Sequence, residues 1–226
     1  MILPDYWMLR PGPAPEPAAI QAFEQLRLEQ VAPGGNRLVD YTLPYPRWQF
    51  LCWLADVHGM ILHGSPASDI AEFEPRQSND QNEFGNQKAV YAAGDGLWAM
   101  YFAILDRQKH PMTLINACIR LRDPQGAVLG PFYFFSIGKP ALEQKPWRTG
   151  MVYILPPETF NAQPSASFAG YDVLVPQFAS LEPVRPLARL EIRPQDFPFL
   201  AQIRGHDDNR LAEYAAAMSS ASAWPE

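Results

Sequence analysis

Two stretches near the start of the chain carry apolar residues at helical spacing. The first, residues 17–31, is followed by the helix-stopping Pro-Gly-Gly of residues 33–35. The second, residues 45–54, is almost entirely apolar, and Pro46 falls in its predicted first turn, where a missing N–H costs nothing. We predict a short amphipathic helix in the first stretch, a mostly buried helix in the second, and a loop without ladder pairing over residues 9–15.

After residue 59 the pattern changes to short runs of β-branched and aromatic residues separated by turn residues. The runs predict strands near residues 60–63, 89–93, 113–122, 127–137, 151–155, 171–175 and 187–192. The turn sequence Asp123-Pro124-Gln125-Gly126 joins two of these runs, which predicts an antiparallel hairpin. The aromatic cluster at residues 131–135 is typical of a core strand.

One more helix is predicted between the second and third of these strands, over residues 95–106. Asp95 is a suitable N-cap for it. The apolar residues expected to share its face are Leu97, Tyr101, Ile104 and Leu105. The last residues, 207–226, include an Ala-rich helical stretch that is expected to fray at its end.

Helices followed by a largely antiparallel sheet indicate an α+β fold. We expect an N-terminal helical extension packed on the core (1–58), one α+β domain (59–205) and a partly helical C-terminal tail (206–226). The 24 prolines and 14 glycines are dispersed from end to end. They favour many short elements joined by turns over a helical bundle.

Charge and hydrophobicity narrow the classes of function. The 226-residue chain has a formal charge of −6 and no run of basic residues, which disfavours non-specific binding to nucleic acid. Its apolar runs are far shorter than the ~20 residues of a membrane span, and a basic secretory region is missing, so we expect a cytoplasmic protein with no membrane contact. Cys52 and Cys118 lie in apolar segments and are expected to be free, buried thiols.

Common catalytic motifs are absent from the sequence. It has no Walker loop, no Gly-x-Gly-x-x-Gly, no Cys-x-x-Cys and no His-Glu-x-x-His. Gly64-Ser65 lacks the further glycine of a nucleophile elbow. The four histidines have no ligand spacing, and we therefore expect no metal site.

A different constellation remains at the first predicted strand of the domain. The strand ends in His63-Gly64-Ser65, a polar loop follows, and the next strand carries Tyr91 shortly before the helix. This order resembles the ADP-ribosyltransferase fold of the poly(ADP-ribose) polymerase type, whose core is a split, largely antiparallel sheet. Residues 151–160 and 177–187 also resemble a bacterial protein group with an early His-Gly-Ser strand.

The resemblance implies an NAD site. His63 would donate a hydrogen bond to a ribose hydroxyl, Gly64 and Ser65 would contact the carboxamide, and Tyr91 would stack on the nicotinamide ring. NAD would be the substrate, and its ADP-ribose would pass to a macromolecular acceptor. We therefore expect His63 and Tyr91 on neighbouring antiparallel strands, with side chains converging on one cleft, and side chains on opposite faces of the sheet would contradict the family assignment. The same residues also fit another explanation, in which His63 is a buried histidine hydrogen-bonded to the backbone and Tyr91 packs in the core.

The third catalytic position of the family is a glutamate on a late strand, and here the matching residue is Gln177. An amide accepts a hydrogen bond but brings no negative charge to an oxocarbenium-like transition state. A catalytically inactive nucleotide-binding or protein-interaction module on the same fold is thus the alternative, unless Glu158 or Glu182 reaches the site. The RNA 2′-phosphotransferase branch of the fold has less support, because basic residues for an RNA phosphate are not evident.

The polar loop at residues 72–87 is longer than most connections between strands. Arg76 lies among its amide side chains and is a candidate to bind the pyrophosphate of the nucleotide. We expect residues 76–87 of this loop to border the cleft and to be more mobile than the strands beside them. The other interpretation is an ordinary polar surface loop.

Overall fold

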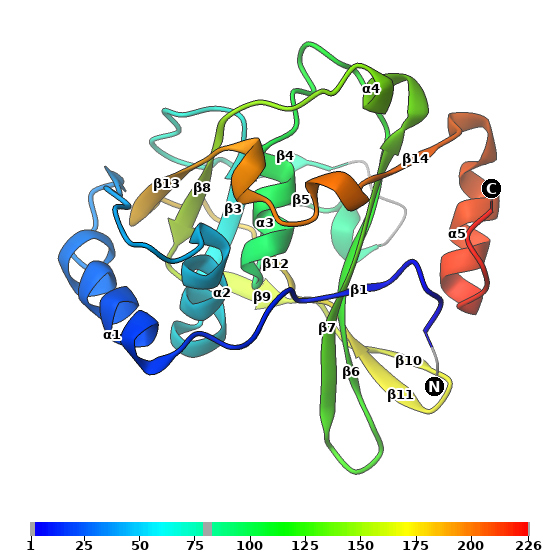
Figure 1. The fold of residues 1–226 in the computed structure, drawn as a ribbon, viewed down its shortest axis with the longest axis horizontal. Helices are drawn as coiled ribbons and strands as arrows, with labels where there is room; N and C mark the ends of the chain where they lie inside the picture. Colours follow the sequence, from blue (N-terminus) through cyan, green and yellow to red (C-terminus); the bar gives the residue numbers. More distant parts are fainter. Residues whose placement is uncertain (1–2, 79–82, 226) are drawn as a thin grey trace.

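The computed structural model describes residues 3–78 and 83–225. Within them the chain forms two β-sheets, with helices between and around them (Figure 1). The central sheet has the strand order β2-β13-β8-β3-β5-β12-β9, with β4 paired to β5. The second sheet has the order β1-β7-β6-β11-β10, with β14 paired to β7. This arrangement confirms the predicted α+β class.

The strands of the central sheet are β2 (Arg37–Leu38), β3 (Ile61–Ser65), β4 (Arg76–Gln77), β5 (Lys88–Ala93), β8 (Gly150–Leu155), β9 (Phe160–Ala162), β12 (Gln177–Ser180) and β13 (Ala188–Ile192). Those of the second sheet are β1 (Met8–Leu9), β6 (Leu114–Arg122), β7 (Val128–Gly138), β10 (Ala166–Phe168), β11 (Tyr171–Leu174) and β14 (Arg204–His206). The helices are α1 (Pro17–Leu26), α2 (Arg47–His58), α3 (Gly96–Ala103), α4 (Lys139–Glu143) and α5 (Leu211–Ser220). Pairing is antiparallel except between β13 and β2 and between β14 and β7.

The main hydrophobic core lies between the two sheets, around α3. Phe23 of α1, Leu51 of α2, Tyr101 of α3, Leu62 of β3 and Phe135 of β7 belong to the same buried cluster. The N-terminal helices therefore share the core of the strands, and β1 and β2 add short edges to the sheets. The boundaries drawn at residues 58 and 205 stay a prediction.

The other face of the central sheet carries a smaller buried cluster, which we call the outer cluster. Its members are Ile61, Phe73, Val90, Ala92, Met151, Tyr153, Leu155 and Val184. Because β3, β5 and β8 have apolar residues on both faces, these strands lie between two hydrophobic layers.

The predicted helices are present, with three differences. The helix predicted over residues 17–31 is α1 followed by a π-helical turn, Arg27–Val31. Pro46 was expected in the first turn of α2. It is instead the N-cap residue, with ψ at 135°, and the helix begins after it. α3 ends at Ala103, and all its residues except Phe102 are buried. It is therefore enclosed on nearly all sides, and the prediction of a single apolar face was wrong.

The predicted N-cap and hairpin are confirmed. The Trp98 N–H donates to Asp95 Oδ1 over 3.0 Å at the start of α3. β6 and β7 form an antiparallel pair around the 123–126 turn and project from the rest of the molecule (Figure 1). The aromatic cluster of β7 is a core strand as expected: Tyr133 and Phe135 join the main core, while Phe134 packs against Tyr6 and Trp224.

All seven predicted strands are present within about two residues, whereas the short strands were missed. The missed strands are β1, β2, β4, β9, β10, β12 and β14. Strands of two to four residues are too short to show alternation. One of them, β1, includes Leu9, the first residue of the predicted loop, and pairs with β7. Cys52 and Cys118 are buried free thiols, as expected. Among residues 3–78 and 83–225, no helix has the length and apolar character needed to cross a membrane.

Candidate functional site

A pocket of about 320 Å³ opens where β3 and β5 separate, and we call it the β3–β5 pocket. In the described part of the chain the two strands share one ladder pair, Leu62 with Ala93, after which β5 pairs instead with β4. α3 forms the floor of the opening, through Trp98, Ala99 and Phe102. The pocket is thus a split in an antiparallel sheet, closed from below by a helix.

Five of the six predicted site residues line this pocket. They are His63, Gly64, Ser65, Tyr91 and Gln177. They come from three neighbouring strands, β3, β5 and β12, although 114 positions of sequence separate His63 from Gln177. Arg76, the sixth, is exposed on β4 and is not part of the lining. The roles assigned to these residues stay predictions.

His63 and Tyr91 lie on neighbouring antiparallel strands as expected, but their side chains leave opposite faces of the sheet. The His63 ring lies 4.5 Å from that of Phe73, in the outer cluster. Tyr91 lies between Val90 and Ala92 of that cluster, and because side chains alternate along a strand it points to the α3 side. The two side chains therefore reach the same pocket through the split, so the expected arrangement on one face was wrong, and their placement counts against the resemblance at these two positions.

His63 occupies the place where the ladder between β3 and β5 is interrupted. Its Nδ1 lies 2.7 Å from the Tyr91 carbonyl, and because a carbonyl only accepts, Nδ1–H is the donor. Nε2 of the neutral ring is then an acceptor, so the ring has no N–H left for the expected donation to a hydroxyl and can only accept from one. Burial lowers the pKa of His63, the bond to the carbonyl partly offsets this effect, and the positive charge of Arg76 lowers the pKa again. The ring is therefore neutral at pH 7.

Gly64 presents backbone, not side chain, to the pocket. The Ile154 carbonyl of β8 accepts from the Leu187 N–H, on the side of β8 that faces β13. Because backbone N–H and C=O groups alternate between the two sides of a strand, those of residues 151, 153 and 155 face β3. By register they bond residues 61, 63 and 65, which leaves the N–H and C=O of Gly64 facing the split. A Cβ at Gly64 would lie 1.8 Å from the Ala99 carbonyl oxygen. Glycine is required here because α3 passes so close, in addition to the predicted approach of a ligand.

Gly64→Ala is expected to lower the free energy of unfolding by about 1–3 kcal/mol or more, since the methyl group meets backbone of α3 that has no rotamer to change. Chemical denaturation of the variant measures this loss. Ser65→Ala, on the same strand, removes only the acceptor of the Ala67 N–H and serves as the control. A Gly64→Ala protein as stable as the wild type would contradict the close approach.

Tyr91 connects the pocket to the described part of the polar loop. Its hydroxyl donates to the Phe84 carbonyl at 2.9 Å and accepts from the Gln87 N–H at 2.7 Å. The 84–87 segment thus contacts a residue of the lining, but none of the described loop residues lines the pocket itself, and the expectation that the loop borders the cleft stays a prediction. Residues 79–82 of the loop lie outside the described residues, and its mobility stays a prediction.

Sequence reasoning did not select eight of the lining residues, and three of these, Trp98, Phe102 and Arg107, carry an aromatic ring or a charge. Trp98 and Phe102 were assigned to a helix without a site role, and Arg107 follows that helix in a turn. Trp98 and Phe102 are four residues apart, which places them on one face of α3 and offered a signal. The sequence around Arg107 has no pattern that distinguishes it from a surface arginine.

The lining described by the structure contains no carboxylate. Glu158 and Glu182 do not reach it, and Gln177, the residue expected to match the glutamate of the family, provides an amide. Gln177 is held by its pairing with Ala93 and by the bond from the Gln163 N–H to its carbonyl, 2.9 Å long. No group of three or more His, Cys, Asp or Glu suited to a metal ion occurs within the described residues. The site offers neutral donors and acceptors, aromatic surface and one cation.

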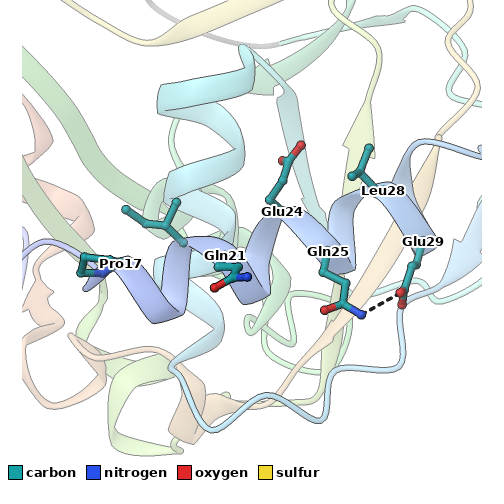
Figure 2. Close-up of a pocket in the computed structure, with 7 residues that line it drawn as sticks. Pro17, Gln21, Glu24, Gln25, Leu28 and Glu29 are labelled. Atoms are coloured by element: carbon teal, nitrogen blue, oxygen red, sulfur yellow. Dashed lines mark hydrogen bonds between the residues drawn. The ribbon is translucent and has the colours of Figure 1, made fainter.

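A second hollow on the molecule is the outer surface of α1, shown in Figure 2. The residues that border it, such as Gln21, Leu28 and Glu29, all come from this helix and the π-helical turn after it. Gln25 donates to Glu29 over 2.9 Å, so these polar groups bond each other along the helix. Among the residues that the structure describes, no other element lines this hollow, and the β3–β5 pocket is the better candidate.

The chain matches no known protein family, no curated protein and no solved structure.

Proposed function

We propose that the β3–β5 pocket binds NAD or a related nucleotide through its nicotinamide-ribose end, in a domain similar to the ADP-ribosyltransferases. The observation that carries the proposal is the meeting of His63, Tyr91 and Gln177, three motif positions distant in sequence, in one pocket. Ligand pockets usually measure about 300–1,000 Å³, so a volume of about 320 Å³ suits one end of a dinucleotide, with the rest extending from the mouth.

The chemistry of the lining supports this ligand. Gly64 directs a backbone N–H and C=O into the split, the pair of groups that a carboxamide needs. Tyr91, Trp98 and Phe102 supply aromatic surface for a planar ring. The neutral Nε2 of His63 accepts a bond from a hydroxyl donor, as the ribose provides.

The absence of a carboxylate from the described lining favours binding with slow turnover. Cleavage of the nicotinamide bond develops positive charge on the ribose, which a carboxylate stabilises and an amide does not. The second candidate function, a nucleotide-binding module that does not transfer ADP-ribose, rests on Gln177. Only the first candidate function, transfer of ADP-ribose, requires a macromolecular acceptor.

Binding is tested by thermal unfolding and calorimetry of the full chain with NAD, ADP-ribose and nicotinamide. A ligand at 100 times its Kd should stabilise the protein by about 2.7 kcal/mol. If none of the three shifts the unfolding transition, the proposed function is wrong.

His63→Ala is expected to weaken NAD binding by about 1 kcal/mol or more, because it removes the acceptor for the ribose hydroxyl. Isothermal titration calorimetry measures the change, and circular dichroism shows whether the variant is folded. His110→Ala is the matched control, since His110 lies outside the pocket and bonds Gln144. Equal NAD affinity in wild type and His63→Ala would remove His63 from the site.

A further inference from the structure

Arg107 is the one cationic side chain in the described lining of the β3–β5 pocket. The lining has no carboxylate, so the formal charge of the described pocket is positive while His63 is neutral. The chain as a whole carries a charge of −6. The pocket therefore differs in sign from the molecule around it, and an anion is attracted to it in preference to a cation.

The turn that carries Arg107 is fixed on both sides. Before it, Leu105 forms a β-bridge with Trp147, and the Asp106 N–H donates to the Pro146 carbonyl at 2.9 Å. After it, the Lys109 N–H donates to Asp106 Oδ1 at 3.1 Å, and the His110 N–H donates to the Asp106 carbonyl at 2.9 Å. Arg107 thus extends from backbone that is held in place at the mouth of the pocket.

The guanidinium of Arg107 is available to a ligand. The residue is exposed, and within the described residues it forms no ion pair. The nearby carboxylate, that of Asp106, is already occupied by the Lys109 N–H and lies 3.8 Å from Arg148 Nη1. An arginine with free N–H groups at the edge of an aromatic pocket fits the planar, bidentate contact with a phosphate.

We infer that Arg107 binds the phosphate of the nucleotide, so that the site selects phosphate-bearing nucleotides over nucleosides. This inference rests on the proposed function and deepens it. It also assigns the phosphate to a different residue from Arg76, which lies on β4 outside the lining. With the base-ribose end in the split and the phosphate at Arg107, the remainder of a dinucleotide leaves the pocket past the 105–110 turn.

The test compares two ligands that share the nicotinamide-ribose end and differ in phosphate, NAD and nicotinamide riboside. Calorimetry on the full chain is expected to show that Arg107→Ala weakens NAD binding by about ten-fold or more and leaves nicotinamide riboside binding unchanged. Added salt should weaken NAD binding to the wild type more than to Arg107→Ala. Lys109→Ala removes the same charge from the same turn outside the lining and is the matched control, and Arg76→Ala tests the competing cation.

The outcomes separate the inference from the proposed function. If the wild type binds neither ligand, the proposed function itself is wrong. If the wild type binds NAD and Arg107→Ala binds it equally well, or loses both ligands to the same extent, the assignment of the phosphate to Arg107 is overturned while the pocket stands. A loss of NAD binding in Arg76→Ala alone would return the phosphate to β4.

Discussion

Replacing Gln177 by glutamate is expected to raise the rate of nicotinamide release from NAD by about 10²–10³-fold. The side chain of residue 177 lines the β3–β5 pocket on the α3 side, together with that of Tyr91. In the proposed NAD complex, a carboxylate there places negative charge beside the ribose as its cationic transition state forms, and the described lining has no carboxylate. The measurement is release of nicotinamide from NAD under single-turnover conditions, for wild type and variant.

Two control variants show whether the gain belongs to this position. Gln163→Glu adds the same charge to a residue that contacts the backbone of Gln177 but does not line the pocket, and it should leave the rate unchanged. Gln177→Ala removes the amide. Rapid release by the wild type that is lost in Gln177→Ala would show that the amide suffices for catalysis, and the slow-turnover proposal would fail.

The sequence predicted those parts of the fold whose signals are local and long. The β6–β7 hairpin has runs of nine and eleven residues around a turn sequence, and the N-cap of α3 is a single side chain bonding backbone three residues away. β12 was not predicted as a strand, because four residues show no alternation, although Gln177 within it was identified through the family resemblance.

The sequence predicted residues of the candidate site but not how their side chains are arranged in space. β5 has apolar residues on both faces, so its sequence does not show which face Tyr91 takes, and only the clusters on either side of the sheet decide it. Arg107 could not be selected, because its place at the pocket depends on the bridge between Leu105 and Trp147, forty-two positions apart. Contacts of this kind are set by packing of the whole chain.

Asp95 links three parts of the molecule that the pocket depends on. It is fully buried, its Oδ1 accepts from the Trp98 N–H, and its Oδ2 accepts from Arg10 and from the Tyr133 hydroxyl, both at 2.8 Å. Arg10 follows β1, and it also bonds Asp56 at the end of α2. One carboxylate thus joins the N-terminal segment, the first turn of α3 and the strand β7.

Asp95→Ala is expected to lower the free energy of unfolding by about 3–5 kcal/mol, the usual cost of removing one partner of a buried ion pair. The variant leaves the Tyr133 hydroxyl and the Trp98 N–H without their acceptor in a buried place, and Arg10, which is partly exposed, keeps only Asp56 as its carboxylate partner. Asp95→Asn keeps an oxygen for the N-cap and should lose part of this amount. Urea denaturation monitored by tryptophan fluorescence measures all three proteins.

Asp123→Ala provides the comparison, because Asp123 also accepts two backbone N–H groups, from Gln125 and Ala127, but in the hairpin turn and far from a buried charge. Its loss should cost about 1 kcal/mol, the usual value for a capping side chain. A double-mutant cycle of Asp95→Ala with Arg10→Ala then isolates the pair, whose coupling should exceed the ~0.2–1 kcal/mol of an exposed ion pair. If Asp95→Ala costs no more than Asp123→Ala, the buried carboxylate does not hold α3 against β7, and the floor of the pocket must be fixed by apolar packing alone.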